Sequence, residues 1–146
     1  MLVDVDVEVL SEVTDEVIQA FGRLLPQLSS TAPPLDVAAL SDIVSAPAST
    51  MLIARADGQI VGTTTLVIFR IPTGIRAWIE DVVVDDSARG RGVGEALTRE
   101  ALRIAGLAGA RTVELTTRPS REAAGRLYER VGFARRDSRL YRYTLS

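Results

Sequence analysis

Residues 86–97 read DSARGRGVGEAL, and this stretch decides how the rest of the sequence is interpreted. Glycines occupy positions 90, 92 and 94, two arginines lie among them, and a helical pattern follows. Glycine has no side chain to hold an anion away from the backbone. The first turn of a helix presents free N–H groups, and its dipole adds about half a positive charge. The stretch therefore predicts an anion-binding turn, to which Arg89 and Arg91 would add charge-assisted hydrogen bonds.

The segments on both sides of this turn predict a strand, a helix and a second strand. An apolar run over Ala77–Val84 precedes the turn, and a helical apolar stripe runs through Gly92–Ala108. Gly109 suits the left-handed end of that helix, and Thr112–Thr117 then alternates like a strand. A strand, helix and strand in succession form a parallel, right-handed crossover, so we expect a mixed sheet.

Hydrophobic periodicity and turn signals predict the other elements. In chain order they are a strand over Val3–Leu10, a helix capped by Thr14, a loop at Leu28–Pro34, a short helix over Asp36–Val44, strands over Thr50–Ala56 and Gln59–Ile71, a helix over Arg121–Val131, and two last strands over Phe133–Arg136 and Leu140–Leu145. The expected fold class is α/β, with a mixed α+β sheet in the order β-α-α-β-β-β-α-β-α-β-β.

Composition excludes several classes of function. The 146 residues contain no cysteine and no histidine, and all 17 basic residues are arginine. Thiolate and imidazole metal sites, Ser-His-Asp triads and lysine-dependent phosphate loops are therefore excluded, and we expect no metal. The acidic, alternating N-terminus is unlike a secretory signal, and no apolar run approaches a membrane span. We expect a cytoplasmic protein that does not bind membranes.

Charge is divided unevenly along the chain. Up to Phe69 there are two arginines and nine acidic residues, whereas the remainder has fifteen arginines and ten acidic residues. This pattern fits either a solvated surface or a polyanionic ligand held by the C-terminal half. A net charge of −2 argues against nucleic acid as the partner, because domains that bind a duplex are usually basic overall.

The spacing of the glycines argues against a dinucleotide-binding fingerprint. That fingerprint places GxGxxG directly after a strand and an acidic residue at the end of the next strand. Here Asp85–Ala88 intervene, the third glycine comes one residue early, and Glu114 lies within its strand. Two interpretations stay open at this point: a cradle for another pyrophosphate, or glycines that only serve a tight turn.

Two motifs at a specific separation carry a family resemblance. Arg89-Gly90-Arg91-Gly92-Val93-Gly94 matches the [R/Q]xxGx[G/A] signature of the GNAT superfamily of N-acetyltransferases, and Ile79–Val84 resembles the fourth strand of that family. A second motif, AxxLYExxGF, is matched by residues 124–133. The order of predicted elements is also similar to the family's order. The resemblance implies a single acyl-CoA-dependent N-acetyltransferase domain over residues 1–146, with central strands that splay apart.

The resemblance implies acetyl-CoA as co-substrate. Its pyrophosphate would lie on the amides of residues 91–94, and its pantetheine arm would pair with the fourth strand like an added strand. The implied cofactor-binding residues are Val82, Val83, Val84, Arg89, Gly90, Arg91, Gly92, Val93, Gly94 and Ser120. One departure concerns the asparagine that many members have seven residues before the tyrosine of the second motif. Arg121 stands at that position, so its contact would pass to Ser120 or Arg121, or be absent.

Acyl transfer to an amine needs a base, a polarised carbonyl and a proton for the thiolate. Glu80 is the implied general base, with Asp81 as the alternative, because adjacent strand residues point to opposite faces. The competing interpretation is a pair of rim carboxylates that hold an arginine. The resemblance makes Tyr128 the general acid and the Val82 N–H the oxyanion donor. From its helical spacing alone, Tyr128 is a core tyrosine.

The amine that accepts the acetyl group is the substrate that the sequence specifies least. We expect a small-molecule amine, either a cationic one, as the acidic N-terminal half favours, or an amino sugar phosphate. The latter is favoured by IED at residues 79–81, which is similar to glucosamine-6-phosphate acetyltransferases. The alternatives are transfer to a protein N-terminus or lysine, and a non-catalytic acyl-CoA sensor. The last strand, Leu140–Leu145, could also pair across a two-fold axis in a homodimer.

Overall fold

The computed structural model describes residues 4–146, which divide into two compact units with the boundary between Thr116 and Thr117. Val3, the expected first residue of the first strand, lies outside the described residues. The single domain over residues 1–146 stays a prediction. No helix within residues 4–146 is both long and apolar enough to cross a membrane.

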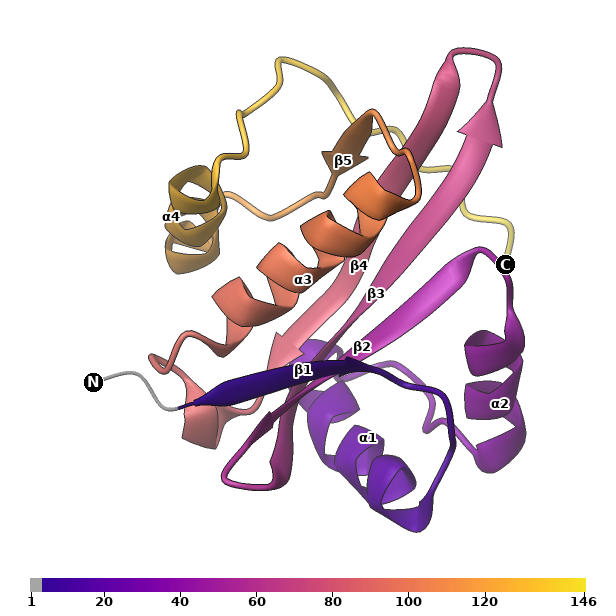
Figure 1. Cartoon of the computed structure of the whole chain (residues 1–146), viewed down its shortest axis with the longest axis vertical. Helices are drawn as coiled ribbons and strands as arrows, with labels where there is room; N and C mark the ends of the chain where they lie inside the picture. The colour runs from indigo at the N-terminus through magenta and orange to yellow at the C-terminus, as the bar shows by residue number, and fades with distance from the viewer. Residues whose placement is uncertain (1–3) are drawn as a thin grey trace. The chain divides into compact units, whose positions relative to one another are not determined.

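The first unit is built on a five-stranded mixed sheet (Figure 1). Its elements are β1 (Val5–Val9), α1 (Asp15–Leu28), α2 (Val37–Ser45), β2 (Ser49–Ala56), β3 (Gln59–Ile71), β4 (Gly74–Val84), the 3-10 turn η1 (Asp86–Ala88), α3 (Val93–Leu107) and β5 (Thr112–Glu114). The strands lie in the order β1-β2-β3-β4-β5. Neighbours from β1 to β4 are antiparallel, and β5 is parallel to β4. The predicted fold class and the parallel crossover are confirmed.

Local signals mark three boundaries where the sequence predicted them, whereas β4 begins at Gly74 rather than Ala77 and β5 ends at Glu114 rather than Thr117. The Thr14 hydroxyl accepts a hydrogen bond from the Val17 N–H at 3.3 Å and caps α1. Asp57 and Gly58 both adopt positive φ, of 53° and 78°, which suits the tight turn between β2 and β3. Gly109, at φ 86°, follows α3 in the left-handed conformation.

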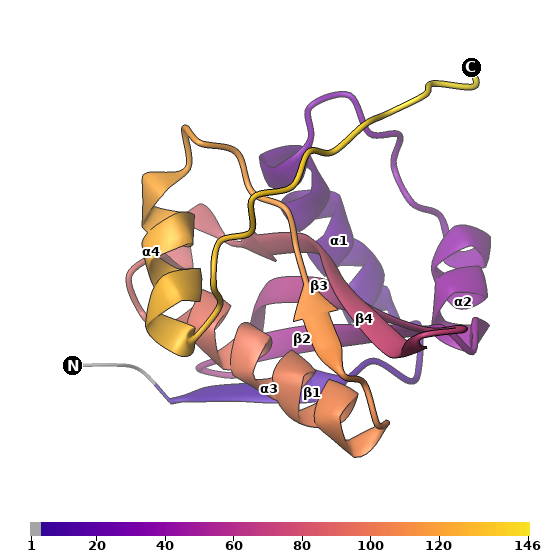
Figure 2. The same cartoon turned by 90° about the horizontal axis from the view of Figure 1, so that it is seen from above.

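Helices cover both faces of the sheet (Figure 2). On one face the core includes Met51, Ile53 and Val83 from the strands and Phe21 and Leu24 from α1. On the other face α3 packs on β3 and β4 through a buried stripe. The approach is so close at Gly62 that a Cβ there would lie 2.9 Å from Val93 Cγ1. Glycine is therefore required at that point of β3.

The second unit contains α4 (Glu122–Val131), which ends at Gly132 with φ 124°. The two strands predicted over Phe133–Arg136 and Leu140–Leu145 are not formed, and this prediction is wrong. A strand is stable only when its backbone groups pair with a neighbour, and residues 133–146 belong to no ladder of the described chain. Tyr141 and Leu145 illustrate the result, with exposed fractions of 87% and 91%.

Candidate functional site

β4 is paired on both sides only along its first half. Its ladder with β5 consists of Arg76–Thr112, Ala77–Val113 and Trp78–Glu114. From Ile79 to Val84 the strand continues with β3 as its only partner. This is the expected parting of the two parallel strands. Backbone groups of β4 directed away from β3 therefore have no β5 partner over these six residues.

A bulge interrupts β4 where the pairing with β5 has ended. Thr63 lies opposite Val83 and Thr65 opposite Glu80, so Asp81 and Val82 both face Thr64. Asp81 adopts φ 54°, a conformation that is strained for most residues other than glycine. The Thr64 hydroxyl donates to the Glu80 carbonyl at 2.9 Å. The bulge is thus held by a side chain of the neighbouring strand.

The register assigns Glu80 to a particular face of the sheet. Thr65 and Thr63, its neighbours on β3, pair in turn with Met51 and Ile53, which belong to the core under α1 and α2. Residues directly opposite one another share a face, so Glu80 lies on the α1–α2 face, and its side chain is exposed there.

The expected alternation of Glu80 and Asp81 does not continue through the bulge. Both side chains are exposed, and Val83 rather than Val82 shares the face of Glu80. The reason is that the additional residue reverses the faces beyond it.

The glycine-rich loop leads from η1 into an α3 that lacks a side-chain cap. Gly90 and Gly92 both have φ 81°, and Gly92 is the N-cap residue. A Cβ added at Gly90 would have nothing within 4 Å. The N–H groups of Val93 and Gly94 lie in the first turn, where the helix supplies no carbonyl for them. These amides and the helix dipole form a site suited to an anion.

The two arginines of the loop are on the surface. Arg89 pairs with Asp86 at 2.9 Å, and Arg91 approaches Asp57 at 4.0 Å. Both pairs are exposed, so each contributes little to stability, and the guanidinium groups can exchange these partners for a ligand.

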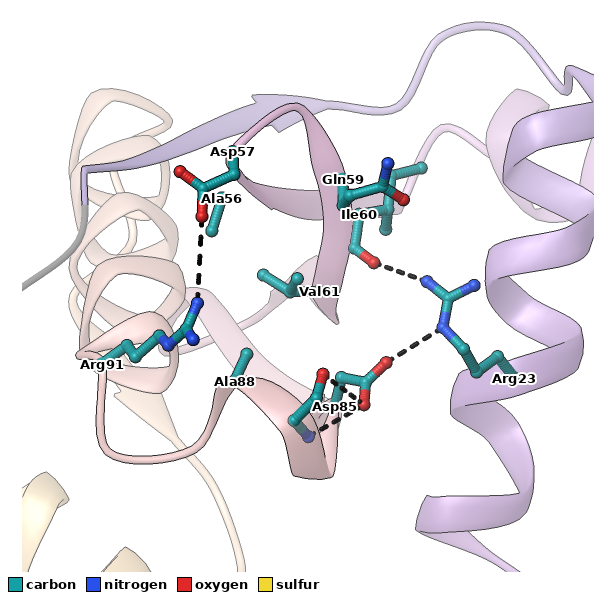
Figure 3. Close-up of a pocket in the computed structure, with 10 residues that line it drawn as sticks. Arg23, Ala56, Asp57, Gln59, Ile60, Val61, Asp85, Ala88 and Arg91 are labelled. Atoms are coloured by element: carbon teal, nitrogen blue, oxygen red, sulfur yellow. Dashed lines mark hydrogen bonds and ion pairs between the residues drawn. The ribbon is translucent and has the colours of Figure 1, made fainter.

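A polar network fixes the turn before the loop (Figure 3). One oxygen of Asp85 accepts from the Ser87 N–H at 3.1 Å and hydroxyl at 3.0 Å, and the other accepts from Arg23 Nε at 2.9 Å. Arg23 also donates to the Ile60 carbonyl at 2.7 Å. The Ser87 N–H, followed by the other donors, lowers the pKa of Asp85 although burial opposes this. Asp85 is therefore a carboxylate at neutral pH.

Sequence reasoning missed this network. Arg23 and Asp85 are 62 residues apart, and only the fold brings them together beside a cavity of about 490 Å³. Gln27, one turn after Arg23, accepts the Asp86 N–H at 2.8 Å. The only local sign of this network in the sequence is that two polar residues, Arg23 and Gln27, lie four positions apart on an amphipathic helix.

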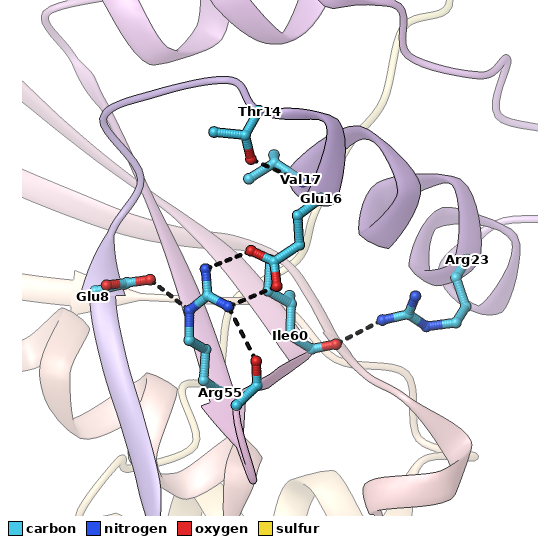
Figure 4. Close-up of polar contacts among 8 residues, drawn as sticks. Glu8, Thr14, Glu16, Val17, Arg23, Arg55 and Ile60 are labelled. Carbon is cyan, nitrogen blue, oxygen red and sulfur yellow. Dashed lines mark hydrogen bonds and ion pairs between the residues drawn. The ribbon is translucent and has the colours of Figure 1, made fainter.

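Arg55 forms a second network at the other end of α1 (Figure 4). Its guanidinium donates to Glu8 at 2.8 Å, to both oxygens of Glu16 at 2.9 Å, and to the Gly58 carbonyl at 3.3 Å. The hydrogen bonds from Arg55 lower the pKa of Glu16. Arg23 and Arg55 are the arginines between residues 4 and 69, and both are engaged by internal acceptors.

The second unit holds Tyr128 and Ser120. Tyr128 is half-buried in α4, and its ring meets Phe133 edge-on with centroids 5.7 Å apart. Burial raises the pKa of Tyr128, with a smaller opposing effect from the charge of Arg121. The phenol is therefore protonated at neutral pH. Ser120 is exposed just before α4. Tyr128 and Glu80 belong to different units, and their meeting at one site stays a prediction.

Among the described residues, the first unit brings most of the predicted site residues into one continuous segment. Glu80 and Val82–Val84 belong to the half of β4 that β5 leaves, and residues 89–94 follow directly after the fixed turn. Residues 4–146 contain no group of three or more acidic, histidine or cysteine side chains arranged to hold a metal ion.

Comparisons with known proteins indicate the family to which the chain belongs. The model of the acetyltransferase (GNAT) family matches residues 14–133. Glucosamine 6-phosphate N-acetyltransferase of Trypanosoma brucei brucei is 34% identical over 140 residues, which cover 90% of each chain. N-alpha-acetyltransferase 30 of Schizosaccharomyces pombe is 38% identical over 74 residues, so the match spans 51% of this chain and about half (49%) of that protein.

A solved structure of an aminoglycoside N-acetyltransferase in complex with CoA has the same fold. Its TM-score is 0.80 at 20% identity, and the match covers 99% of this chain and 97% of that chain.

Proposed function

We infer the substrates from one premise: the chain belongs to the acetyltransferase (GNAT) family. It is an acetyl-CoA-dependent N-acetyltransferase. We propose that it transfers the acetyl group of acetyl-CoA to the primary amine of a small molecule, by direct attack in a ternary complex. The observation that carries this proposal is the loss of β5 pairing along Ile79–Val84, next to an uncapped helix start.

The proposed binding mode uses backbone groups for most of the cofactor. The pyrophosphate lies on the amides that begin α3, with Arg89 and Arg91 beside it, and the pantetheine arm pairs with Val82–Val84. The bound CoA in the aminoglycoside N-acetyltransferase of the same fold supports this choice of ligand. The exposed ion pairs of the two arginines support it too, since a diphosphate offers both a stronger acceptor.

The proposed chemistry needs three proton transfers, because the nitrogen loses two protons and the sulfur gains one. Glu80 removes the first proton from the acceptor ammonium, the amine nitrogen attacks the thioester carbonyl, the C–S bond breaks, and the nitrogen releases its second proton to solvent. The Val82 N–H stabilises the oxyanion, and Tyr128 gives its proton to the departing thiolate. The products are an N-acetyl amide and CoA with a free thiol. A phenol that burial keeps protonated suits this donor role.

The proposed acceptor lies on the α1–α2 face of the sheet, because the register places Glu80 there. Small amines are supported by the names of two similar proteins, a glucosamine 6-phosphate and an aminoglycoside N-acetyltransferase. Arg23 and Arg55, the arginines between residues 4 and 69, are both paired with carboxylates of the chain. This pairing favours a cationic acceptor over a phosphorylated one. The homodimer and the cytoplasmic location stay predictions, although the strand over Leu140–Leu145 that was expected to pair across a two-fold axis is not formed.

The test is an acceptor screen with acetyl-CoA, scored by release of free thiol. The panel contains polyamines, aminoglycosides, amino sugar phosphates and peptides with a free N-terminus or lysine. We expect thiol release with a small amine, and a fall of about 100-fold in turnover for Tyr128→Phe with unchanged affinity for acetyl-CoA. Release with peptides alone would replace this proposal with a protein acetyltransferase. Acetyl-CoA binding without release across the whole panel would indicate a sensor.

A further inference from the structure

Two side chains of α1 hold the turn that precedes the glycine-rich loop. Arg23 donates to the Asp85 carboxylate at 2.9 Å and to the Ile60 carbonyl at 2.7 Å. Gln27 accepts the Asp86 N–H at 2.8 Å, and its own amide donates to the Arg23 carbonyl at 3.2 Å. One turn of one helix therefore contacts two successive residues of the turn.

The effect is that three successive N–H groups are fixed in direction. The Asp85 N–H bonds to the Val61 carbonyl at 2.8 Å, the Asp86 N–H to Gln27, and the Ser87 N–H to the Asp85 carboxylate. The Ala88 N–H then bonds to the Asp85 carbonyl at 2.8 Å. The backbone is thus determined up to the point where the glycines begin, and the orientation of the loop depends on Asp85.

The network contributes more to position than to stability. Arg23 is about half exposed (45%), and an ion pair this accessible to water adds little to the free energy of folding. Asp85 is less accessible, at 13%, and takes its other hydrogen bonds from Ser87. Losing Arg23 would leave one carboxylate oxygen held by Ser87 and the other without its donor. Small displacements of a binding group are costly in affinity and rate.

We propose that Arg23 and Gln27 are positioning residues, through which α1 sets the orientation of the loop that binds the acetyl-CoA pyrophosphate. This inference rests on the proposed function. It gives α1 two roles, because the same helix also builds the core beneath the face that carries Glu80.

The experiment measures acetyl-CoA binding by calorimetry and, separately, the KM for acetyl-CoA and kcat with the best acceptor of the screen. For Arg23→Met, which keeps the apolar stem, we expect Kd and KM to rise about tenfold while kcat at saturation stays within about twofold. Arg23→Lys should recover part of the affinity, since an ammonium can still pair with Asp85 but cannot donate in the same two directions. Gln27→Ala is a second variant and should raise KM by a smaller factor.

The matched control is Arg55→Met. Arg55 lies in the same half of the chain and holds two carboxylates, but it donates to no group of residues 85–94. We expect its Kd for acetyl-CoA to equal that of the unmodified protein. A merely structural role of Arg23 would lower the melting temperature and the active fraction, and so kcat, but would leave KM unchanged.

The outcomes separate this inference from the proposed function. If the unmodified protein does not bind acetyl-CoA, the proposed function fails. If it binds but Arg23→Met and Gln27→Ala bind equally well, the positioning role fails while the proposed function stands. A tenfold loss in Arg23→Met that is absent in Arg55→Met supports the positioning role.

Discussion

The two halves of β4 differ in the number of neighbouring strands with which they pair. In the first half, Ala77 is fully buried between β3 and β5. In the second half, Glu80 and Asp81 are exposed, β5 has left, and a bulge places Asp81 at φ 54°. The first half resembles the interior strands of any mixed sheet, whereas the second half exposes backbone groups and carboxylates.

The difference indicates how one strand serves folding with its first half and the proposed chemistry with its second. Pairing on both sides of the first half anchors the strand, so the second half can lose a partner and accept the strain at Asp81. The Arg23–Asp85 network then fixes the chain again before the glycine-rich loop. The segment Ile79–Val84, which β5 does not pair, therefore has firmly held structure on both sides. A binding or catalytic site needs such support to keep its geometry.

The largest effect, on the stability of the fold, is expected for a substitution in the first half of β4. Ala77→Asp would bury a charge with no partner and should reduce the free energy of unfolding by about 3 kcal/mol or more, so the protein unfolds or aggregates. Urea or thermal unfolding measures this. Glu80→Gln, three residues further along, is the control and should change stability by less than about 0.5 kcal/mol. A tolerated Ala77→Asp would contradict the structural role of this half.

The next largest effect, on acetyl-CoA affinity, is expected in the glycine-rich loop that follows the second half of β4. Gly94→Glu places a carboxylate in the first turn of α3, and we expect at least about a 100-fold loss of acetyl-CoA affinity, or about 2.7 kcal/mol, with the fold retained. Gly94 is the cleaner position, because Gly92 has φ 81° and a side chain there adds strain.

Gly106→Glu is the matched control at the other end of α3, where an added Cβ meets nothing within 4 Å. The affinity of the Gly106→Glu variant for acetyl-CoA should stay unchanged. Normal affinity in Gly94→Glu would argue against the anion site at the start of this helix.

A smaller effect, on turnover, is expected for Glu80→Gln in the second half of β4. The amide cannot take a proton, so turnover at pH 7 should fall about 100-fold or less while acetyl-CoA affinity stays the same. Activity should increase with pH, because more of the acceptor amine is then already neutral. A pH–rate profile measures this, and a profile identical to that of the unmodified protein would remove Glu80 from the role of base.

The smallest effect is the pH dependence of Asp85. Its pKa is lowered in the folded state, so its stabilisation is fully present above its unfolded pKa of about 4 and is lost as pH falls through the lower folded value. Asp85→Asn lacks this titration. The difference in melting temperature between the two proteins should therefore be constant from pH 5 to 8, and shrink only in stronger acid. A difference that grew as the pH fell would have the wrong sign.

Local signals were sufficient wherever a feature depends on neighbours in sequence. The Thr14 cap, the Asp57–Gly58 turn and the glycines before α3 were predicted because capping and positive φ are properties of short segments. The last two strands were predicted from alternation alone and are absent, because alternation does not supply a partner.

The sequence by itself determined the class of fold, the glycine-rich turn at the start of a helix and the family, since each follows from residue types at fixed spacing. Only the tertiary structure decided which face carries Glu80, where β5 leaves β4, and that Arg23 holds Asp85. These features arise from pairings between distant segments, and a shift of one residue at Thr64 would change all the faces that follow. Such a register is set by the packing of the whole sheet.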